Sequence, residues 1–149
     1  MAYKRTTPED LIDRLEINDL LTRYTTAIDN QDWELLDTVF TPDAEVDYTS
    51  SGGIAGTYPE ARKWLSEVLP IFSATLHYIS NSTVELDGDR AHAKTYVWNP
   101  MHMKLADGSD HSFTVGGFYE DEIVRTPEGW RIARRHEQQV LMEGSLPGS

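Results

Sequence analysis

Asp29 is the first residue whose place in the sequence points to chemistry. It follows apolar residues at three- and four-residue spacing, which predict one face of an α-helix: Ile17, Leu20, Leu21, Tyr24, Ala27 and Ile28. Asp29 therefore stands at the negative end of the helix macrodipole, where an exposed carboxylate costs about 0.3 to 1 kcal/mol. We hypothesise that another group uses this charge. The alternative is a solvated aspartate that begins the turn "DNQD" at 29–32.

A carboxylate in such a place has a use in acid–base chemistry. An ionised aspartate that accepts a hydrogen bond from one imidazole nitrogen fixes the tautomer and leaves the other nitrogen as a base. Such a pair suits elimination reactions. In these, the base removes a proton beside a carbonyl or activated ring, and hydroxyl or imidazole donors protonate the departing oxygen.

Other kinds of catalytic site find little support in the sequence. His92, His111 and His136 have no metal-ligand spacing with neighbouring carboxylates, and the chain has no cysteine. The glycines of 50–56 and 115–117 lack the strand-to-helix context of a phosphate-binding loop. We therefore expect no metal site and no nucleotide.

Length and charge limit the domain count and the partners. With 149 residues the chain fits a single domain over 1–149. Thirteen basic and twenty-five acidic residues give a formal charge of -12, which repels nucleic-acid phosphates and anionic membrane surfaces. No apolar run has the length of a membrane span and no export signal is recognised, so a cytoplasmic location is expected.

Helical signals dominate the first half of the chain. Thr7 is the expected N-cap of the first helix and Pro8 suits its first position. A second helix is expected over 32–40 and a third over 58–72, with a strand over 44–49 and a loop over 50–56 between them. Pro70 is expected to kink or end the third helix.

From residue 75 the pattern changes to alternation. Four β-rich segments, at 75–86, 90–105, 111–125 and 129–142, are separated by turn sequences and predict an antiparallel meander. Because each helix has an apolar stripe to bury, we expect an α+β fold. It would be a cone-shaped α+β barrel, with three N-terminal helices packed in a strongly curved, mainly antiparallel sheet. Bulges are expected at Gly116–Gly117 and at Pro100, and a mobile tail at 143–149.

Three pieces of the sequence, at 23–48, 75–81 and 129–136, resemble the SnoaL-like branch of the nuclear transport factor 2-like superfamily. The resemblance covers about residues 8–142 and implies a helix-and-sheet cone with an internal pocket. Within this branch, the sequence is most similar to scytalone dehydratase, bile-acid 7α-dehydratase and the lindane dehydrochlorinase. These enzymes eliminate a small group without a metal or an organic cofactor, so no cofactor is expected here.

The resemblance also implies catalytic residues. Asp29 and His77 match an aspartate and a histidine that these enzymes pair, so His77 would be the base and Asp29 its orienter. Tyr24 and Tyr48 match pocket tyrosines of the two dehydratases. His102 follows His77 by the separation of a second catalytic histidine in scytalone dehydratase. The dehydrochlorinase has a lysine where Tyr24 stands, so its dehalogenating chemistry is not carried over.

Each of these residues also has a simpler interpretation. His77 suits a hydrogen-bonded core position, and Tyr24 and Tyr48 suit ordinary packing. Packing on a strand face explains His102 as well as catalysis does. Arg135 matches a cavity arginine of the dehydrochlorinase, subject to a bulge that would shift the register by one, but it also suits a surface position in the basic run "RIARR".

The expected function follows from a dry apolar pocket around these groups. Its lining candidates are Phe40, Ile54, Trp64, Leu69, Phe72, Met101, Met103, Phe113 and Phe118, with Arg135. We expect a cofactor-independent lyase of the dehydratase type that acts on a hydrophobic polycyclic or aromatic small molecule, steroid-like or polyketide-like. The alternatives are a proton transfer of the ketosteroid-isomerase or polyketide-cyclase type, and a noncatalytic module that binds a small molecule or a protein. A homo-oligomer, dimer or trimer, is expected because meanders of this kind often expose one sheet face to a partner subunit.

Overall fold

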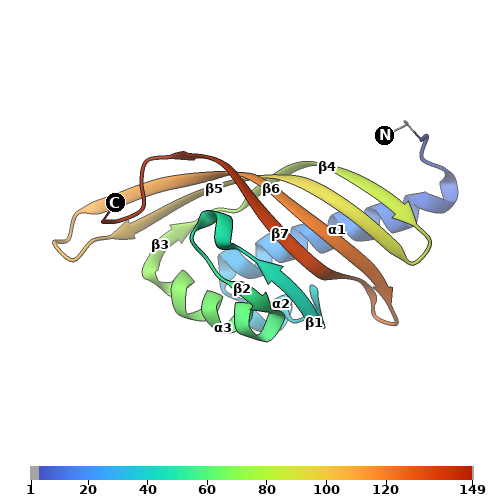
Figure 1. Cartoon of the computed structure of the whole chain (residues 1–149), viewed down its shortest axis with the longest axis horizontal. Helices are drawn as coiled ribbons and strands as arrows, with labels where there is room; N and C mark the ends of the chain where they lie inside the picture. The colour runs from blue at the N-terminus through green and yellow to red at the C-terminus, as the bar shows by residue number, and fades with distance from the viewer. Residues whose placement is uncertain (1–3, 149) are drawn as a thin grey trace.

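The computed structural model describes residues 4–148, so residues 1–3 and 149 of the expected domain range lie outside it. The helices are α1 (Pro8–Asn30), α2 (Trp33–Leu36) and α3 (Tyr58–Val68), with 3-10 turns η1 (Thr49–Ser51) and η2 (Leu69–Ile71). The strands are β1 (Phe40–Asp47), β2 (Ala55–Thr57), β3 (Phe72–Thr75), β4 (Tyr78–Asp87), β5 (Arg90–Lys104), β6 (Asp110–Thr126) and β7 (Gly129–Glu143). Figure 1 shows α1 lying along a curved sheet, with α3 and β2 below the long strands in this view.

The seven strands form one mixed sheet. Its order is β2-β1-β7-β6-β5-β3, and β4 pairs with the other half of the long strand β5. Strands β4 to β7 make the expected antiparallel meander, while β1 pairs with β7 in parallel. The sheet is curved but unclosed, with β2 and β3 at its edges. The predicted α+β fold is confirmed, and the barrel stays open.

The sequence predicted where the helices begin more accurately than where they end. The Thr7 hydroxyl caps α1 by accepting from the Asp10 N–H, and Asp32 caps α2 by accepting from the Leu35 N–H at 3.0 Å. Helix α2 is a single turn, shorter than the expected 32–40, because the chain enters β1 at Phe40. Helix α3 ends at Val68, and Pro70 lies in the 3-10 turn that follows.

Three strand predictions are corrected. The expected loop at 50–56 contains the start of β2, which adds an edge to β1. The expected strand at 75–86 is interrupted, because β3 ends at Thr75 and β4 begins at Tyr78. The register shifts between Gly116 and Gly117 as predicted, but Pro100 pairs with Thr114 without a shift.

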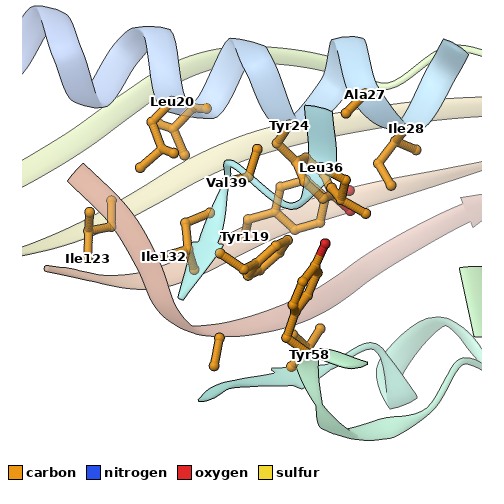
Figure 2. Close-up of a cluster of buried hydrophobic side chains, with 14 of the residues drawn as sticks. Leu20, Tyr24, Ala27, Ile28, Leu36, Val39, Tyr58, Tyr119, Ile123 and Ile132 are labelled. Carbon is orange, nitrogen blue, oxygen red and sulfur yellow. The ribbon is translucent and has the colours of Figure 1, made fainter. Parts of the chain in front are cut away.

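The core lies between α1 and the inner face of the sheet. Figure 2 shows Leu20, Tyr24 and Ile28 of α1 reaching Tyr119, Ile123 and Ile132 of the sheet. All six are at most 2% exposed. The apolar residues that predicted α1 are therefore the residues that α1 buries. Asp29 follows them at the C-terminal end of the helix. Within residues 4–148, none of the helices combines the length and hydropathy that a membrane crossing requires.

Candidate active site

The break between β3 and β4 places His77. Leu76 and His77 lie between the two strands, so the backbone N–H of His77 is not used in the sheet ladder. This N–H donates instead to Oδ2 of Asp29, at 2.9 Å. The end of α1 and the edge of the sheet are thereby joined at one residue.

Asp29 and His77 also meet through their side chains. The Nδ1 atom of His77 lies 2.6 Å from Oδ1 of Asp29, and the Thr75 hydroxyl donates to the same oxygen at 3.1 Å. Burial alone would raise the pKa of Asp29, but these hydrogen bonds from His77 and Thr75 outweigh it and lower that pKa. The ionised carboxylate only accepts hydrogen bonds, so Nδ1 carries a proton, and in the neutral imidazole Nε2 has the lone pair.

His77 lies on the wall of a cavity of about 200 Å³. Its Nε2 has no hydrogen-bond partner in the part of the chain that the structure describes. The cavity wall is mostly apolar: Leu65, Val68, Leu69, Phe72, Met101, Phe113, Val115, Trp64 and Leu146 line it with Tyr24, Tyr48, Tyr119, Ser51, Gly52, Asn99, His77 and Glu137. An oriented imidazole with a lone pair at an apolar cavity has the arrangement of a general base.

Two of the expected tyrosines face each other in this cavity. The hydroxyls of Tyr24 and Tyr48 are 2.8 Å apart, and both residues are at most 4% exposed. Burial raises the pKa of each phenol, so both stay protonated near neutral pH. The pair can therefore offer a hydrogen-bond donor to an oxygen of a bound molecule.

The cavity wall also contains polar residues that sequence reasoning missed, among them Asn99 and Glu137. Asn99 and Glu137 are each 7% exposed, and Oδ1 of Asn99 is buried without a hydrogen-bond partner. Asn99 was detectable, because it alternates with Val97 and Met101 on the inner face of β5. Leu146, on the same wall, comes from the segment that was expected to be a mobile tail.

His102 lies on the other face of β5. It is exposed, and its Nδ1 is 2.8 Å from the Ser112 hydroxyl. Successive strand residues point to opposite faces, so placing Met101 in the cavity places His102 outside it. The expectation that His102 belongs to the catalytic set is corrected on this ground.

Four apolar lining candidates are also absent from the cavity wall. Phe40 is packed in the core, stacked on Tyr58 at a ring distance of 4.8 Å. Phe118 lies on the outer face of the sheet against Tyr96. Ile54 accepts the Tyr48 backbone N–H at 2.8 Å, and neither Ile54 nor Met103 lines the cavity. The cavity does receive Trp64, Leu69, Phe72, Met101 and Phe113, as expected.

Arg135 matches neither of its two interpretations. It is 1% exposed, so it is no surface residue, and it does not line the cavity. Its Nε and Nη2 atoms donate to the two carboxylate oxygens of Asp121 at 2.8 and 2.7 Å. The guanidinium lies 4.0 Å from the Tyr24 ring centre and 4.1 Å from that of Tyr119, behind the cavity wall. Arg135 therefore supports two cavity-lining tyrosines without lining the cavity itself.

Metal-ligating side chains do not gather anywhere in residues 4–148: no three His, Asp or Glu residues are placed to hold an ion. Several side chains on the cavity wall can take part in acid–base chemistry. These are a base at His77, protonated tyrosines, and the carboxyl group of Glu137.

Comparison with known proteins agrees with this architecture. The family model described as SnoaL-like domain matches residues 9–136. An uncharacterized protein of Mycobacterium tuberculosis is 45% identical over 134 residues, which are 90% of this chain and 90% of that protein. A structure described as a candidate aromatic ring hydroxylase from Novosphingobium aromaticivorans is 30% identical, covers 94% of this chain and 96% of its own, and gives a TM-score of 0.81.

Two further structures share the fold at lower identity. A candidate scytalone dehydratase from Novosphingobium aromaticivorans is 21% identical with a TM-score of 0.82, and the match covers 95% of this chain and 93% of that chain. A hexachlorocyclohexane dehydrochlorinase from Novosphingobium barchaimii is 22% identical with a TM-score of 0.76, covering 95% and 94%. The helix-and-curved-sheet arrangement is shared across proteins named for two different eliminations.

Proposed function

Because this chain belongs to the SnoaL-like domain family, we propose that it is a cofactor-independent lyase of the dehydratase type. One observation carries the proposal: an oriented imidazole with an unpartnered Nε2 on the wall of an apolar cavity. His77 is the general base and Asp29 holds its tautomer and stabilises the imidazolium. The dehydratase and dehydrochlorinase named among the similar structures are eliminating enzymes, which supports the same reaction class.

The tyrosine pair takes the second part of the reaction. When the base removes a proton beside a carbonyl, negative charge develops on the carbonyl oxygen. A protonated Tyr24 or Tyr48 can donate to this oxygen, and a buried donor costs no reorganisation during the reaction. The same pair supports the second candidate, an isomerase or cyclase, because those reactions need the enolate but no leaving group.

The cavity volume narrows the substrate class. An apolar cavity of about 150 Å³ in another protein holds benzene. The cavity of about 200 Å³ here suits a substrate whose reacting part has one or two rings. It favours aromatic or polyketide-like compounds over a four-ring steroid, and the aromatic ring in the name of the 30% identical relative agrees with that class.

A water-loss screen tests the proposal. The protein is incubated with one- and two-ring β-hydroxy carbonyl compounds, and mass spectrometry follows the loss of water. A parallel incubation in deuterated water detects proton exchange without elimination, which would indicate the isomerase or cyclase. Ligand binding with neither water loss nor exchange in the wild type would favour the noncatalytic module.

The assembly and the location stay predictions. The outer face of the sheet exposes apolar side chains that suit a second copy: Tyr78, Tyr96, Trp98, Val140 and Leu141, each at least 39% exposed. Light scattering on the wild type and on Trp98→Glu tests the homo-oligomer, since a charge at a buried interface would dissociate it. A monomeric wild type would contradict the prediction. A cytoplasmic location stays an expectation from the sequence alone.

A further inference from the structure

Glu137 is a buried acidic residue on the cavity wall. The mechanism proposed above, with His77 as base and the tyrosines as donors, does not use it. It lies on β7 opposite Tyr119 of β6 and is 7% exposed. An ionised carboxylate in such a place is costly unless it is paired. Burial is the main cause that raises the pKa of Glu137 above its ordinary value.

Within the described residues, no cationic side chain forms an ion pair with the Glu137 carboxyl group. The only side-chain partner of its carboxyl group in residues 4–148 is the Ser51 hydroxyl, which donates to Oε1. The nearby buried cation, Arg135, is engaged by both oxygens of Asp121. The second carboxyl oxygen of Glu137 has no hydrogen-bond partner among the described residues.

The surrounding loop holds this carboxyl in place. The Ser50 hydroxyl donates to the Glu137 carbonyl oxygen at 2.8 Å and accepts the Gln139 N–H at 2.9 Å. Together with the Ser51 contact, this fixes η1 on β7 on both sides of Glu137. A carboxyl that is fixed at one oxygen and free at the other is suited to act on a bound molecule.

Glu137 and His77 line the same cavity from different parts of the sheet. His77 lies at the β3–β4 break beside β5, whereas Glu137 lies on β7, with β6 between β5 and β7. Both side chains line the 200 Å³ space. They interact across it, because positive charge on His77 lowers the pKa of Glu137. A substrate in the cavity can therefore contact both the base and this carboxyl group.

We propose that Glu137 is the catalytic acid, which donates its carboxyl proton to the departing oxygen. This inference rests on the proposed lyase function and extends it. The Nε2 of His77 takes a proton from carbon, and the electrons of that C–H bond form the new double bond. The C–O bond breaks, its electrons stay on oxygen, and the Glu137 proton completes the water that leaves. The imidazolium then returns its proton to the Glu137 carboxylate through solvent.

The charged and titratable groups around Glu137 come from β6, β7, the first helix, the end of β1 with the residue after it, and the break between β3 and β4. Arg135 and His77 lower its pKa and Asp47 raises it, while the phenols of Tyr24, Tyr48 and Tyr119 are themselves kept protonated by burial. The working state needs neutral His77 together with protonated Glu137. Elimination of a basic leaving group should therefore fail at a pH where Glu137 has lost its proton.

Two small probes separate the acid from the base. Benzisoxazole and its nitro derivative, with the nitro group para to the ring oxygen, are bicyclic and suit the cavity. A base removes the ring C–H, the N–O bond breaks, a nitrile forms and the oxygen leaves as a phenoxide. The plain phenoxide is basic and gains from a proton donor, whereas the nitrophenoxide is stable without one.

Glu137→Gln is the informative variant, because it keeps the size of the side chain and an oxygen that accepts from Ser51. We expect it to slow elimination of benzisoxazole about tenfold or more and that of the nitro compound less than about twofold. Equal slowing of both probes, or of neither, would overturn the acid role. Glu143→Gln, an exposed carboxyl on the same strand, is the matched control and should leave both rates unchanged.

The two proposals fail in different ways. If His77→Ala leaves both probes at the wild-type rate, the base assignment and the lyase proposal fail together. If only the Glu137 effect is missing, the lyase proposal stands and the acid role is wrong. Carbon-13 NMR titration of labelled glutamates provides a readout without turnover: the resonance missing in Glu137→Gln should titrate above the exposed glutamates. Titration together with them would also overturn the assignment.

Discussion

The fold contains two close pairs of an acidic and a basic side chain, Asp29 with His77 and Asp121 with Arg135. Their contact distances are similar, but their positions and burial differ. Asp29 and His77 meet at 2.6 Å, and Asp121 and Arg135 at 2.7 to 2.8 Å. The first pair joins the end of a helix to a break in the sheet and lies at a cavity. The second joins two neighbouring strands, and both of its side chains are fully buried.

The difference lies in where each pair leaves an atom unpartnered. Asp121 gives both oxygens to Arg135, whose guanidinium packs over the rings of Tyr24 and Tyr119 and keeps an unpartnered Nη1 buried away from the cavity wall. His77 gives one nitrogen to Asp29 and keeps the other for the cavity. A short acid–base contact is thus no sign of catalysis in itself. The informative feature is an unpartnered atom on a cavity wall.

The largest expected effect is on turnover at the first pair. His77→Ala should lower the rate about 10²- to 10⁴-fold, because it removes the base, while circular dichroism shows an intact fold. Adding Asp29→Asn should cost little more, since one removal already disables the shared step. Multiplicative losses in the double variant would mean that the two residues act independently.

Mutation of the second pair, Asp121 and Arg135, should lower the stability of the protein. Asp121→Asn leaves the buried charge of Arg135 uncompensated, so we expect the free energy of unfolding to fall by about 3 to 5 kcal/mol in urea titrations. Replacing both partners by apolar residues, as in Asp121→Leu with Arg135→Met, should restore much of this loss. If the double variant is no more stable than the single one, the pair is needed as a pair.

Asp29→Asn alone should lower turnover by about two orders of magnitude, by analogy with orienting aspartates in other enzymes. Because a neutral amide can donate to Nδ1, it permits the other tautomer and removes the charge that stabilises the imidazolium. Asn30→Asp changes the charge at the next residue of the same helix and is the matched control, which should leave turnover unchanged.

The same variant has a pH signature. Hydrogen bonds from His77 and Thr75 lower the folded pKa of Asp29 below its ordinary 3.8, despite burial. The stabilisation is therefore fully present above the unfolded pKa and is lost as pH falls through the lower folded pKa. Acid titrations of unfolding should show the wild type and Asp29→Asn converging below that range. A stability difference that stays constant down to low pH would contradict the depressed pKa.

Tyr48→Phe should have a smaller effect, about tenfold on turnover, because Tyr24 remains as a donor. Loss of the hydroxyl-to-hydroxyl contact should cost about 1 kcal/mol of stability. Steady-state kinetics and thermal unfolding measure the two effects. An unchanged rate would mean that the pair is structural, like the second ion pair.

The smallest expected effect is at His102. His102→Gln should change turnover less than about twofold, because the residue lies outside the cavity and contacts Ser112. A large loss of turnover in a folded variant would reinstate His102 in the site and contradict its position on the outer face.

Local patterns predicted much of this fold. The helical stripe from Ile17 to Ile28 is buried, Thr7 and Asp32 cap their helices, and the meander runs as expected. These features depend on residues close in sequence, where capping geometry and periodicity act directly. The contact between Asp29 and His77 was expected from the family resemblance. Their roles in a reaction stay predictions.

The second half of β7 shows what local patterns leave undecided. Trp130 and Ile132 are buried, and simple alternation would next bury Arg134 and His136. The register with β6 shifts at Ala133, where Ile123 pairs with Ile132 and Glu122 with Arg134. This bulge turns Arg135 and Glu137 inward. One extra residue in a strand reverses every face after it, and nothing in "RIARRHE" marks where the extra residue falls.

The sequence by itself thus determined the helices, the meander and the residue types that carry acid–base chemistry, because these follow from spacing over a few residues. Only the tertiary structure decided which polar groups share the cavity. The break at His77 frees an N–H for Asp29, the phase of β5 turns Asn99 inward and His102 outward, and the bulge at Ala133 buries Glu137. Each of these depends on how strands distant in sequence pair and which face of the sheet is covered, and that pairing is settled only when the whole core packs.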